Sequence, residues 1–328
     1  MTATTPTHVD SSIPEIWARL TLRDSLRSGF WAKFAGAEGS RSPIIRRTDL
    51  LNNPGDTIHI SVTGPLVGAG IQGDTTLLEG AEENLTTSDM LVIPDIYRHG
   101  VLFYRRANVK SMLDLRSEAQ MRLAEWGQEK MDDLRFASYV SAANLNGATY
   151  VPLFTVAGGG VVGAADVVAT DVLTVDVIQR AKLAMYNNRA MPLRTSDGND
   201  YFGMVCHPNS LYNLKRDQEY RDWVKDAEVR GAGNPFFQGA VAMIDGVVLY
   251  QHNNVITAND GGASATVARN IMFGAEAFVE GISEDPHWNE DDFDYGNRHG
   301  VAYAFAIQCR RALPKNSLIV YSAAVAPT

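Results

Sequence analysis

Apolar positions change their spacing several times along the chain, and each change predicts a different element. Between Pro14 and Phe34 the large apolar residues recur at intervals near three and four, which predicts an amphipathic helix. Residues 36–47 then bring glycine, serine and proline before a basic pair, and this composition predicts an extended arm. The chain therefore begins with a helix and an arm rather than with a compact unit.

Residues 55–104 form a two-limbed β excursion. One limb is DTIHISV, the return limb is MLVIPDIYRHGVLFYRR, and the tip between them holds five glycines and most of the acidic residues. A tip with so few large apolar side chains cannot bury itself, and long loops of this kind are usually functional or disordered. We expect the excursion to rest on another surface.

The clearest element is a long helix from Asn108 to about Ala142. Asn108 is a suitable N-cap, and Glu118 and Arg122 form an i,i+4 pair on the polar face. At 1.5 Å per residue the helix would run roughly 50 Å, longer than a compact domain needs, so we interpret it as a strut. Its predicted apolar face consists of Met112, Leu115, Ala119, Leu123, Trp126, Leu134 and Ala137.

The pattern of helix, strand and turn signals in residues 174–265 predicts an α/β unit. A second amphipathic helix is expected at about 174–188, followed by a buried strand, a break at His207-Pro208 and another helix. Asp245-Gly246 is a good hairpin turn between two short strands. Beyond residue 261, three strand-like runs close the chain in a mainly antiparallel arrangement.

Composition narrows the functional classes. With 328 residues and 45% hydrophobic content the chain can bury a large core, and no apolar run predicts a secretion signal or a membrane span. The net charge of -9 argues against a protein whose main task is to grip phosphate backbones. A surface that merely encloses nucleic acid is compatible with it.

The stretch GAGIQG, residues 68–73, matches the G-x-G-x-x-G pattern of dinucleotide-binding enzymes. That pattern works only when the third glycine opens a helix whose amides face the phosphate. The following residues, rich in threonine and interrupted by Gly80 and Pro94, favour strand and turn instead. The interpretation as a cofactor site is therefore disfavoured.

Other chemical signals are weak. Asp291, Asp292 and Asp294 could ligate a cation, but the run 284–297 lacks the glycine and terminal glutamate of a calcium loop, so we expect a solvated loop. We interpret His207 as a structural turn residue, and Cys206 and Cys309 as buried thiols. No nucleophile, metal or phosphate motif is present, so we predict no enzyme and no cofactor.

Charge is distributed unevenly around the β excursion. From Gly55 to Tyr97 there are seven acidic residues and no lysine or arginine. Opposite patches on one chain favour head-to-tail contact between copies, whereas the simpler alternative is that the acids only keep the loop soluble. The candidate contact residues are Asp74, Glu79, Glu82 and Glu83 in the loop, and Arg46, Arg47, Arg98, Arg105 and Arg106 near its ends; Gly68, Gly70, Gly73 and Gly80 would let the loop bend.

The order of arm, β hairpin, strut helix, α/β unit and closing β segment resembles the major capsid proteins of tailed phages with the HK97-type fold, and more specifically the coat proteins of N4-like phages. The resemblance covers residues 14 to 325. It is carried by the stretches GDTIHISV, GDTTLLEGAEENLT, LAEWGQEKMDDLRF, MVCHPNSLYNL, NPFFQGAVAMIDGVVLY, IMFGAEAFVEG and DFDYGNRHGVAYAF, with Arg310 and Arg311 following.

The resemblance implies an α+β fold divided into an N-terminal arm (1–54), an E-loop (55–107), a P-domain with a spine helix (108–173), an A-domain (174–265) and a return to the P-domain (266–328). It implies hexamers and pentamers that build an icosahedral shell around double-stranded DNA without sequence-specific binding. The implied partners are further copies and separate scaffolding, portal and decoration proteins. The implied location is the virion, assembled in the host cytoplasm, with no membrane.

Two departures from the family matter. Some members crosslink an E-loop lysine to a neighbour, but residues 55–95 contain no lysine, so we expect no such bond. No scaffolding domain precedes the arm in this sequence, so we expect any scaffold to be a separate protein. The alternatives are a bacterial nanocompartment shell protein of the same fold and, less favoured, a nucleotide-dependent oxidoreductase that uses residues 68–73.

Overall fold

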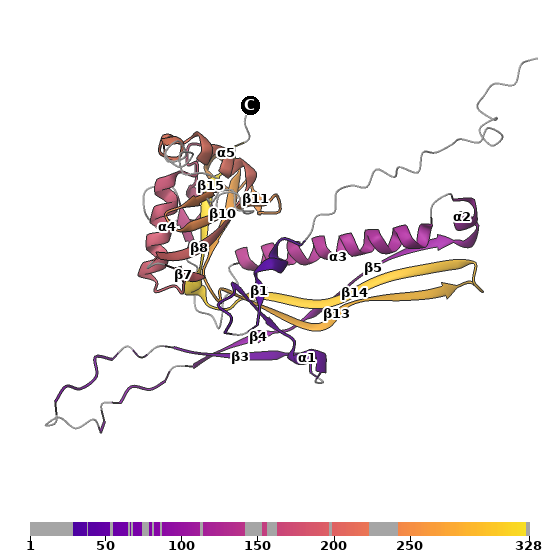
Figure 1. The fold of residues 1–328 in the computed structure, drawn as a ribbon, viewed down its shortest axis with the longest axis horizontal. Helices are drawn as coiled ribbons and strands as arrows, with labels where there is room; N and C mark the ends of the chain where they lie inside the picture. The colour runs from indigo at the N-terminus through magenta and orange to yellow at the C-terminus, as the bar shows by residue number, and fades with distance from the viewer. Residues whose placement is uncertain are drawn as a thin grey trace, which may run out of the picture.

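The computed structural model of the chain shows an elongated molecule with an α/β unit, a long arm and a projecting loop (Figure 1). The arm and the loop point in opposite directions from the middle of the molecule (Figure 1). The residues that the structure describes are 29–37, 39–52, 55–64, 66, 68–73, 79–80, 82–85, 87–111, 114–141, 153–155, 163–196, 199–222 and 242–325. Most of the predicted helix at residues 14–34 and the acidic residue Asp74 lie outside them.

The long arm of the molecule is not the predicted N-terminal arm (1–54): it is built on a five-stranded sheet with the order β1-β2-β13-β14-β5. Its strands are β1 (Ala35–Gly36), β2 (Ile44–Arg47), β13 (Phe278–Phe293), β14 (Arg298–Arg311) and β5 (Asp95–Tyr104). The β13–β14 hairpin carries the length of the arm, and its register shifts between Ile282 and His287. Pro286 lies in this stretch and cannot donate a ladder hydrogen bond, which accounts for the irregularity.

The long helix α3 (Leu115–Val140) lies along this sheet (Figure 1). It begins later than predicted, because Asp114 caps it through the Arg116 amide at 3.2 Å, whereas Asn108 accepts a hydrogen bond from the Leu115 amide. The helix can approach β14 closely at Gly127, where a Cβ would lie 2.2 Å from the ring of Tyr303. The predicted Glu118–Arg122 pair is confirmed at 3.2 Å.

The buried face of α3 differs from the predicted one in its second half. Ala119 and Leu123 are buried as expected, but Ala137 is exposed. The buried positions toward the end of the helix are instead Asp132, Arg135, Phe136 and Tyr139. The prediction counted only apolar residues, so it could not include the charged residues Asp132 and Arg135 in the buried face.

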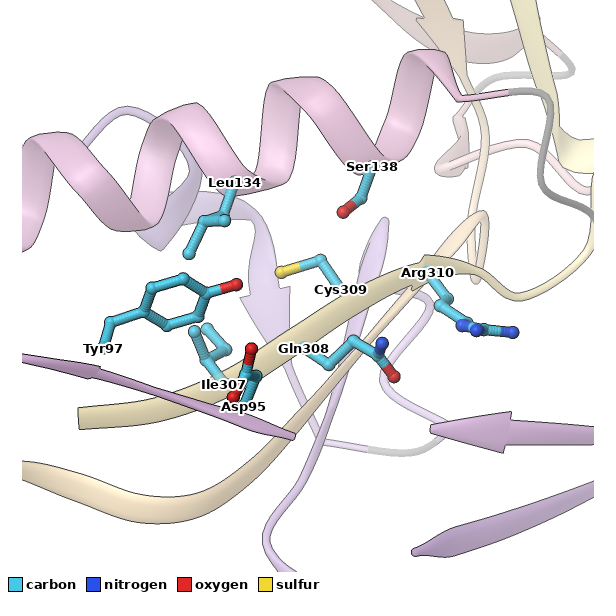
Figure 2. A pocket seen from close by; sticks show the side chains of 8 residues that line it. All are labelled: Asp95, Tyr97, Leu134, Ser138, Ile307, Gln308, Cys309 and Arg310. Carbon is cyan, nitrogen blue, oxygen red and sulfur yellow. The ribbon is translucent and has the colours of Figure 1, made fainter. Parts of the chain in front are cut away.

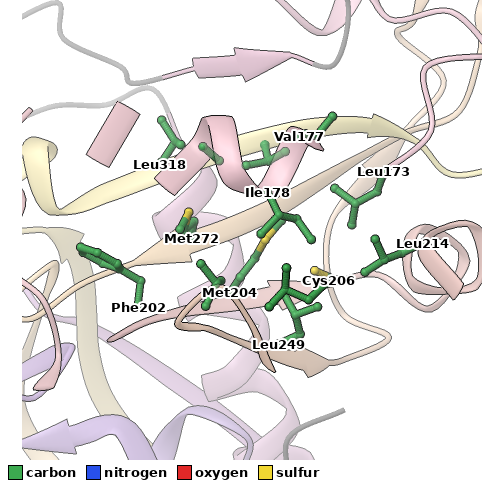
Figure 3. Packing of buried hydrophobic residues seen from close by; sticks show 14 of the residues in the cluster. Leu173, Val177, Ile178, Phe202, Met204, Cys206, Leu214, Leu249, Met272 and Leu318 are labelled. Atoms are coloured by element: carbon green, nitrogen blue, oxygen red, sulfur yellow. The ribbon is translucent and has the colours of Figure 1, made fainter. Parts of the chain in front are cut away.

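The α/β unit contains an eight-stranded sheet whose main path is β6-β15-β12-β8-β10-β9. Helix α4 (Val175–Asn187) packs its apolar face on this sheet, and its bounds agree with the prediction to within a residue (Figure 3). The strands are β6 (Leu153–Thr155), β7 (Arg194–Ser196), β8 (Asn199–Cys206), β9 (Ala242–Ile244), β10 (Val247–Gln251), β11 (Thr257–Ala258), β12 (Val267–Phe273) and β15 (Ser317–Ala323).

Local sequence signals are confirmed in this unit. Asp245 and Gly246 have φ values of 45° and 77°, as a two-residue hairpin turn requires. His207 caps helix α5 (Pro208–Arg216), because its Nδ1 accepts a hydrogen bond from the Asn209 amide at 3.2 Å. Its predicted role as a structural residue is therefore confirmed.

The projecting loop is a separate two-stranded sheet of β3 (Ile58–Thr63) and β4 (Thr87–Val92). The predicted return limb is thus split: β4 stays in the loop, whereas β5 joins the arm as an edge strand. Two short helices flank these strands, α1 (Asp49–Asn52) at the base of the loop and α2 (Arg105–Lys110) at the far end of the arm (Figure 1).

The last part of the chain divides between the two larger sheets. In the stretch 266–328, β13 and β14 lie in the five-stranded sheet, whereas β12 and β15 pair within the eight-stranded sheet. One expectation about this part of the chain needs correction. The acidic run 284–297 is not a loop: residues up to 293 continue β13, and only 294–297 form the turn. Its side chains are nonetheless largely exposed, as expected for a charge run.

Short 3-10 turns occur at Trp31–Phe34, Ala164–Asp166, Gly262–Ser264 and Pro314–Asn316. None of the helices in the described part of the chain is long and apolar enough to cross a membrane.

Candidate functional site

The acidic loop tip is the first predicted surface. Glu79, Glu82 and Glu83 are all exposed there. Glu82 accepts a hydrogen bond from the Gly80 amide at 2.7 Å, and Glu83 accepts one from the Gly68 amide at 2.6 Å, so two of the three carboxylates also shape the loop itself. Glu79 has no hydrogen bond or ion pair to another described residue.

The glycines of the loop serve backbone geometry. Gly70, Gly73 and Gly80 have φ values of 68°, 92° and 86°, which side chains other than glycine rarely tolerate. The Gly68 amide, which would face a phosphate in a dinucleotide site, donates to the carboxylate of Glu83. Residues 74–78, which would open such a helix, lie outside the described part of the chain, and residues 79–80 form a turn, so the structure gives the nucleotide interpretation no support.

The five candidate arginines are spread along the molecule rather than gathered. Arg46 lies on β2 with its Nε 3.5 Å from Glu280, and Arg47 beside it also has an interaction within the chain. Arg98 lies in the middle of β5, and Arg105 and Arg106 lie on α2 at the end of the arm opposite the loop (Figure 1). Arg98, Arg105 and Arg106 are exposed and form no ion pair with another described residue.

A groove of about 410 Å³ runs over the arm sheet around Arg98. Its lining includes the small residues Gly100, Gly300, Ala302 and Ala304, together with Leu102 and Phe293. Because Tyr303 and Phe305 alternate with these alanines and pack toward α3, the groove lies on the sheet face away from the helix. An extended segment with leucine side chains would fit such a floor.

A second, smaller cavity of about 270 Å³ opens where β4 bends into β5 (Figure 2). Asp95, Tyr97, Ser138 and Cys309 contribute to its wall. The Ile93 amide donates to the Gln308 side chain at 2.5 Å beside it, which fixes the bend. Burial raises the pKa of the Cys309 thiol and of the Tyr97 hydroxyl, so neither group is activated for chemistry.

The described residues contain no further candidate for a catalytic or metal-binding site. Cys206 and Cys309 are free and buried as predicted. No group of three metal-ligating side chains occurs among the described residues, including the run 284–297. There, Asp292 pairs with His299, and Glu290 pairs with Arg116 at 2.6 Å.

A buried charge network connects α3 to the sheet, and sequence analysis missed it. Arg135 lies 3.1 Å from Asp132 and 2.5 Å from Glu280 of β13, and all three side chains are at most 5% exposed. Desolvation lowers the pKa of the Arg135 guanidinium, but the facing Glu280 carboxylate outweighs it, so the net pKa is raised. The only sequence signal was a charged pair at i,i+3 within the helix stripe.

The same network holds the segment that enters from the N-terminus. The amides of Phe30 and Trp31 donate to Asp132 at 2.5 and 3.4 Å. Trp31 is fully buried among the rings of Phe136, Tyr139, Phe273 and Phe278, at centroid distances of 5.1 to 6.0 Å. Helix, arm sheet and α/β unit therefore meet around one aromatic residue.

Comparison with known proteins gives the family. A family model described as phage capsid protein matches residues 12–311. The chain belongs to the phage capsid protein family. It is 26% identical over 326 residues to the major capsid protein of Pseudomonas phage KPP25, covering 88% of this chain and 86% of that protein.

Solved structures of phage capsids support the assignment of this chain to the phage capsid protein family. The capsid of Ralstonia phage GP4 matches with a TM-score of 0.77 and 26% identity over 100% of both chains. The Cyanophage Pam1 capsid matches in fold with a TM-score of 0.80 and 19% identity, covering 97% of this chain and 98% of that one. The predicted α+β fold of the HK97 type and the predicted function as a major capsid protein are confirmed.

Proposed function

We propose that this capsid protein assembles as hexamers and pentamers into an icosahedral shell that encloses double-stranded DNA without sequence-specific contacts. The observation that carries the proposal is the placement of an acidic loop at one end of an elongated subunit and of exposed basic side chains along the arm that extends the other way (Figure 1). Such a subunit is suited to head-to-tail contacts that close into rings. The role is structural, without catalytic activity.

Further proposals follow from the family. Assembly takes place in the host cytoplasm with separate scaffolding, portal and decoration proteins. We also propose that residues 1–54 act as the N-terminal arm, 55–107 as the E-loop, 174–265 as the axial domain, and 108–173 with part of 266–328 as the peripheral domain. The sheet pairings refine these limits, because β5 belongs with β13 and β14, and β12 with β8.

Electron microscopy of the purified protein tests the proposed function. Closed icosahedral shells are expected, and particles from infected cells should contain DNA. A nanocompartment protein would instead give small shells with enzyme cargo, and an oxidoreductase would give dispersed oligomers. Dispersed oligomers under all assembly conditions would refute the shell.

The loop contact can be described more closely. We propose that the loop of one copy lies in the groove around Arg98 of the next copy. Leu66 and Leu85 are 62% and 68% exposed in the loop, and the groove floor offers space for such side chains. Glu79 and Glu82 would then face Arg98, which forms no ion pair with another described residue, because opposite charges fix the register of a contact.

Reversing charge in the loop should therefore block assembly. Glu79→Lys combined with Glu82→Lys is expected to reduce the yield of shells by about tenfold or more, since facing like charges cost several kcal/mol. The yield is measured by sedimentation and electron microscopy. Glu83 is left unchanged because its hydrogen bond to the Gly68 amide links residues 15 positions apart in the loop, whereas the Glu82 carboxylate bonds to the Gly80 amide only two positions away.

Two further variants interpret the result. Arg98→Glu added to the double variant should restore shells, because the facing charges are again opposite. Glu219→Lys with Asp166→Lys makes the same change in net charge at exposed positions of the α/β unit and should still assemble. Normal assembly of the loop variant would show that its charges only keep the loop soluble.

A further inference from the structure

Two short connections, described along their whole length, join the eight-stranded sheet to the five-stranded sheet. Residues 274–277 lead from β12 into β13, and residues 312–316 lead from β14 into β15. The Ala312 amide donates to the Ala277 carbonyl at 2.9 Å, so the two connections run side by side. A change in the angle between the two sheets must therefore bend this pair of connections.

The aromatic core closes one side of the crossing. Phe273 ends β12 and Phe278 begins β13, and their rings lie 6.2 Å apart in the cluster that contains Trp31. Apolar contact is not directional, so a core on one side leaves two sheets able to rock about it. The angle between them needs a second support with a fixed geometry.

Asn316 supplies that support on the second connection. Its side chain is 0% exposed, and its Oδ1 accepts a hydrogen bond from the Met191 amide at 3.0 Å. Its Nδ2 donates to the Ala275 carbonyl at 2.7 Å, and its backbone carbonyl accepts from the Gly274 amide at 2.8 Å. One residue thus ties the two connections to each other and to the segment that follows α4.

The backbone around Asn316 is closely packed. The Ala275 amide also donates to the Met191 carbonyl at 2.9 Å, and a Cβ on Gly274 would lie 2.1 Å from that carbonyl oxygen, so the close approach requires glycine. Glu276 has a φ of 52°, uncommon for a residue other than glycine, and its amide donates to the Ser42 carbonyl at 2.9 Å. The first connection is therefore held to the α/β unit at Met191 and to the arm at Ser42.

We propose that Asn316 is a clamp that fixes the angle between the eight-stranded and five-stranded sheets, and that this angle sets the curvature of the shell. The second half of the inference rests on the proposed function, because curvature exists only where copies are joined. A closed assembly requires each copy to present its contacts at a constant rotation to the next, so a variable angle within the subunit prevents uniform closure. A buried side-chain amide suits this role because its donor and acceptor have fixed directions and are costly to leave unpaired.

Asn270 provides a matched control within one unit. It is also 0% exposed, its Oδ1 accepts from the His207 amide at 3.0 Å, and its Nδ2 donates to the Ser322 hydroxyl at 2.8 Å. All these partners belong to the α/β unit. Asn316→Ala and Asn270→Ala should therefore both unfold at lower urea concentration, but only Asn316→Ala should loosen the crossing between the sheets.

Hydrogen exchange of the unassembled subunit tests the clamp. The readout is the pair of amides of Gly274 and Ala275, because their acceptors are backbone carbonyls that Asn316→Ala leaves in place. Both amides are expected to exchange about tenfold faster or more in Asn316→Ala, and at the wild-type rate in Asn270→Ala. Wild-type exchange of these amides in Asn316→Ala would overturn the clamp.

Asn316→Asp is the second variant, and it serves if the alanine variant does not fold. It keeps the size of the side chain and the acceptor for the Met191 amide, and it removes only the donor to the Ala275 carbonyl. The same faster exchange at Gly274 and Ala275 is expected. Unchanged exchange in this variant would show that the bond between the two connections does not hold them.

Electron microscopy of assembled shells tests the link to curvature. Shells of Asn316→Ala are expected to vary in diameter or to stay open, whereas Asn270→Ala should give shells as uniform as the wild type. Uniform shells from Asn316→Ala despite faster exchange would overturn the role in curvature. Absence of wild-type shells would overturn the proposed function, and exchange in the unassembled subunit would still decide whether Asn316 is a clamp.

Discussion

Arg135→Met is expected to lower the free energy of unfolding of the subunit by about 3–5 kcal/mol, because it leaves a buried carboxylate without its partner. Glu280 is 0% exposed and lies 2.5 Å from Arg135, so water cannot replace the guanidinium. Arg46, at 3.5 Å from the other carboxylate oxygen, is 42% exposed and cannot compensate fully. Urea denaturation of the unassembled subunit measures the loss.

The same helix supplies a matched control. Arg122 also contacts two carboxylates, Glu118 and Glu125, but its side chain is 38% exposed. Arg122→Met should therefore cost about 1 kcal/mol or less. Adding Glu280→Leu to Arg135→Met should recover part of the loss, since it removes the orphaned charge. Equal stability of Arg135→Met and Arg122→Met would show that the network contributes nothing beyond a surface pair.

Trp31→Ala is the second substitution with a large expected effect. Trp31 is 0% exposed and fills the space between α3, the arm sheet and the α/β unit, so its removal should cost about 3–5 kcal/mol. Urea denaturation gives the magnitude. Limited proteolysis gives the location, because the segment around residue 30 should become the first site of cleavage once its anchor is lost.

Trp288→Ala is the control for this substitution. Trp288 is 39% exposed and contacts one ring, that of Tyr303 at 4.6 Å, so its loss should cost about 1–2 kcal/mol. If Trp31→Ala were no more damaging than Trp288→Ala, the segment at residues 30–34 would not anchor the N-terminal arm to the rest of the subunit.

The two substitutions act on one junction. Asp132 accepts the amides of Phe30 and Trp31 and also pairs with Arg135, so the aromatic anchor and the charge network share a residue. This junction joins the entering segment to the spine helix and, through Glu280, to the hairpin of the arm.

Local elements of this protein followed from the sequence. The helix at 175–187, the turn at Asp245-Gly246 and the break at His207-Pro208 were predictable because each depends on the spacing and backbone preferences of neighbouring residues. The Glu118–Arg122 pair was predictable for the same reason. The resemblance of the chain as a whole to phage capsid proteins supplied the fold class.

Tertiary structure decided what depends on residues far apart in the chain. Glu280 lies 145 positions after Arg135, and the spacing of neighbouring residues cannot predict that these two side chains meet in the core. The assignment of β5 to the arm, and of β12 to the eight-stranded sheet, likewise depends on pairings with distant strands. The candidate arginines lie near the two ends of the β excursion in sequence, but they are separated in space. Arg46 pairs with Glu280 within the chain, and the ten-residue strand β5 carries Arg105 to the far end of the long arm. The sequence therefore determined the local elements and the family, whereas contacts between residues far apart in the chain determined which charges are buried, paired or exposed.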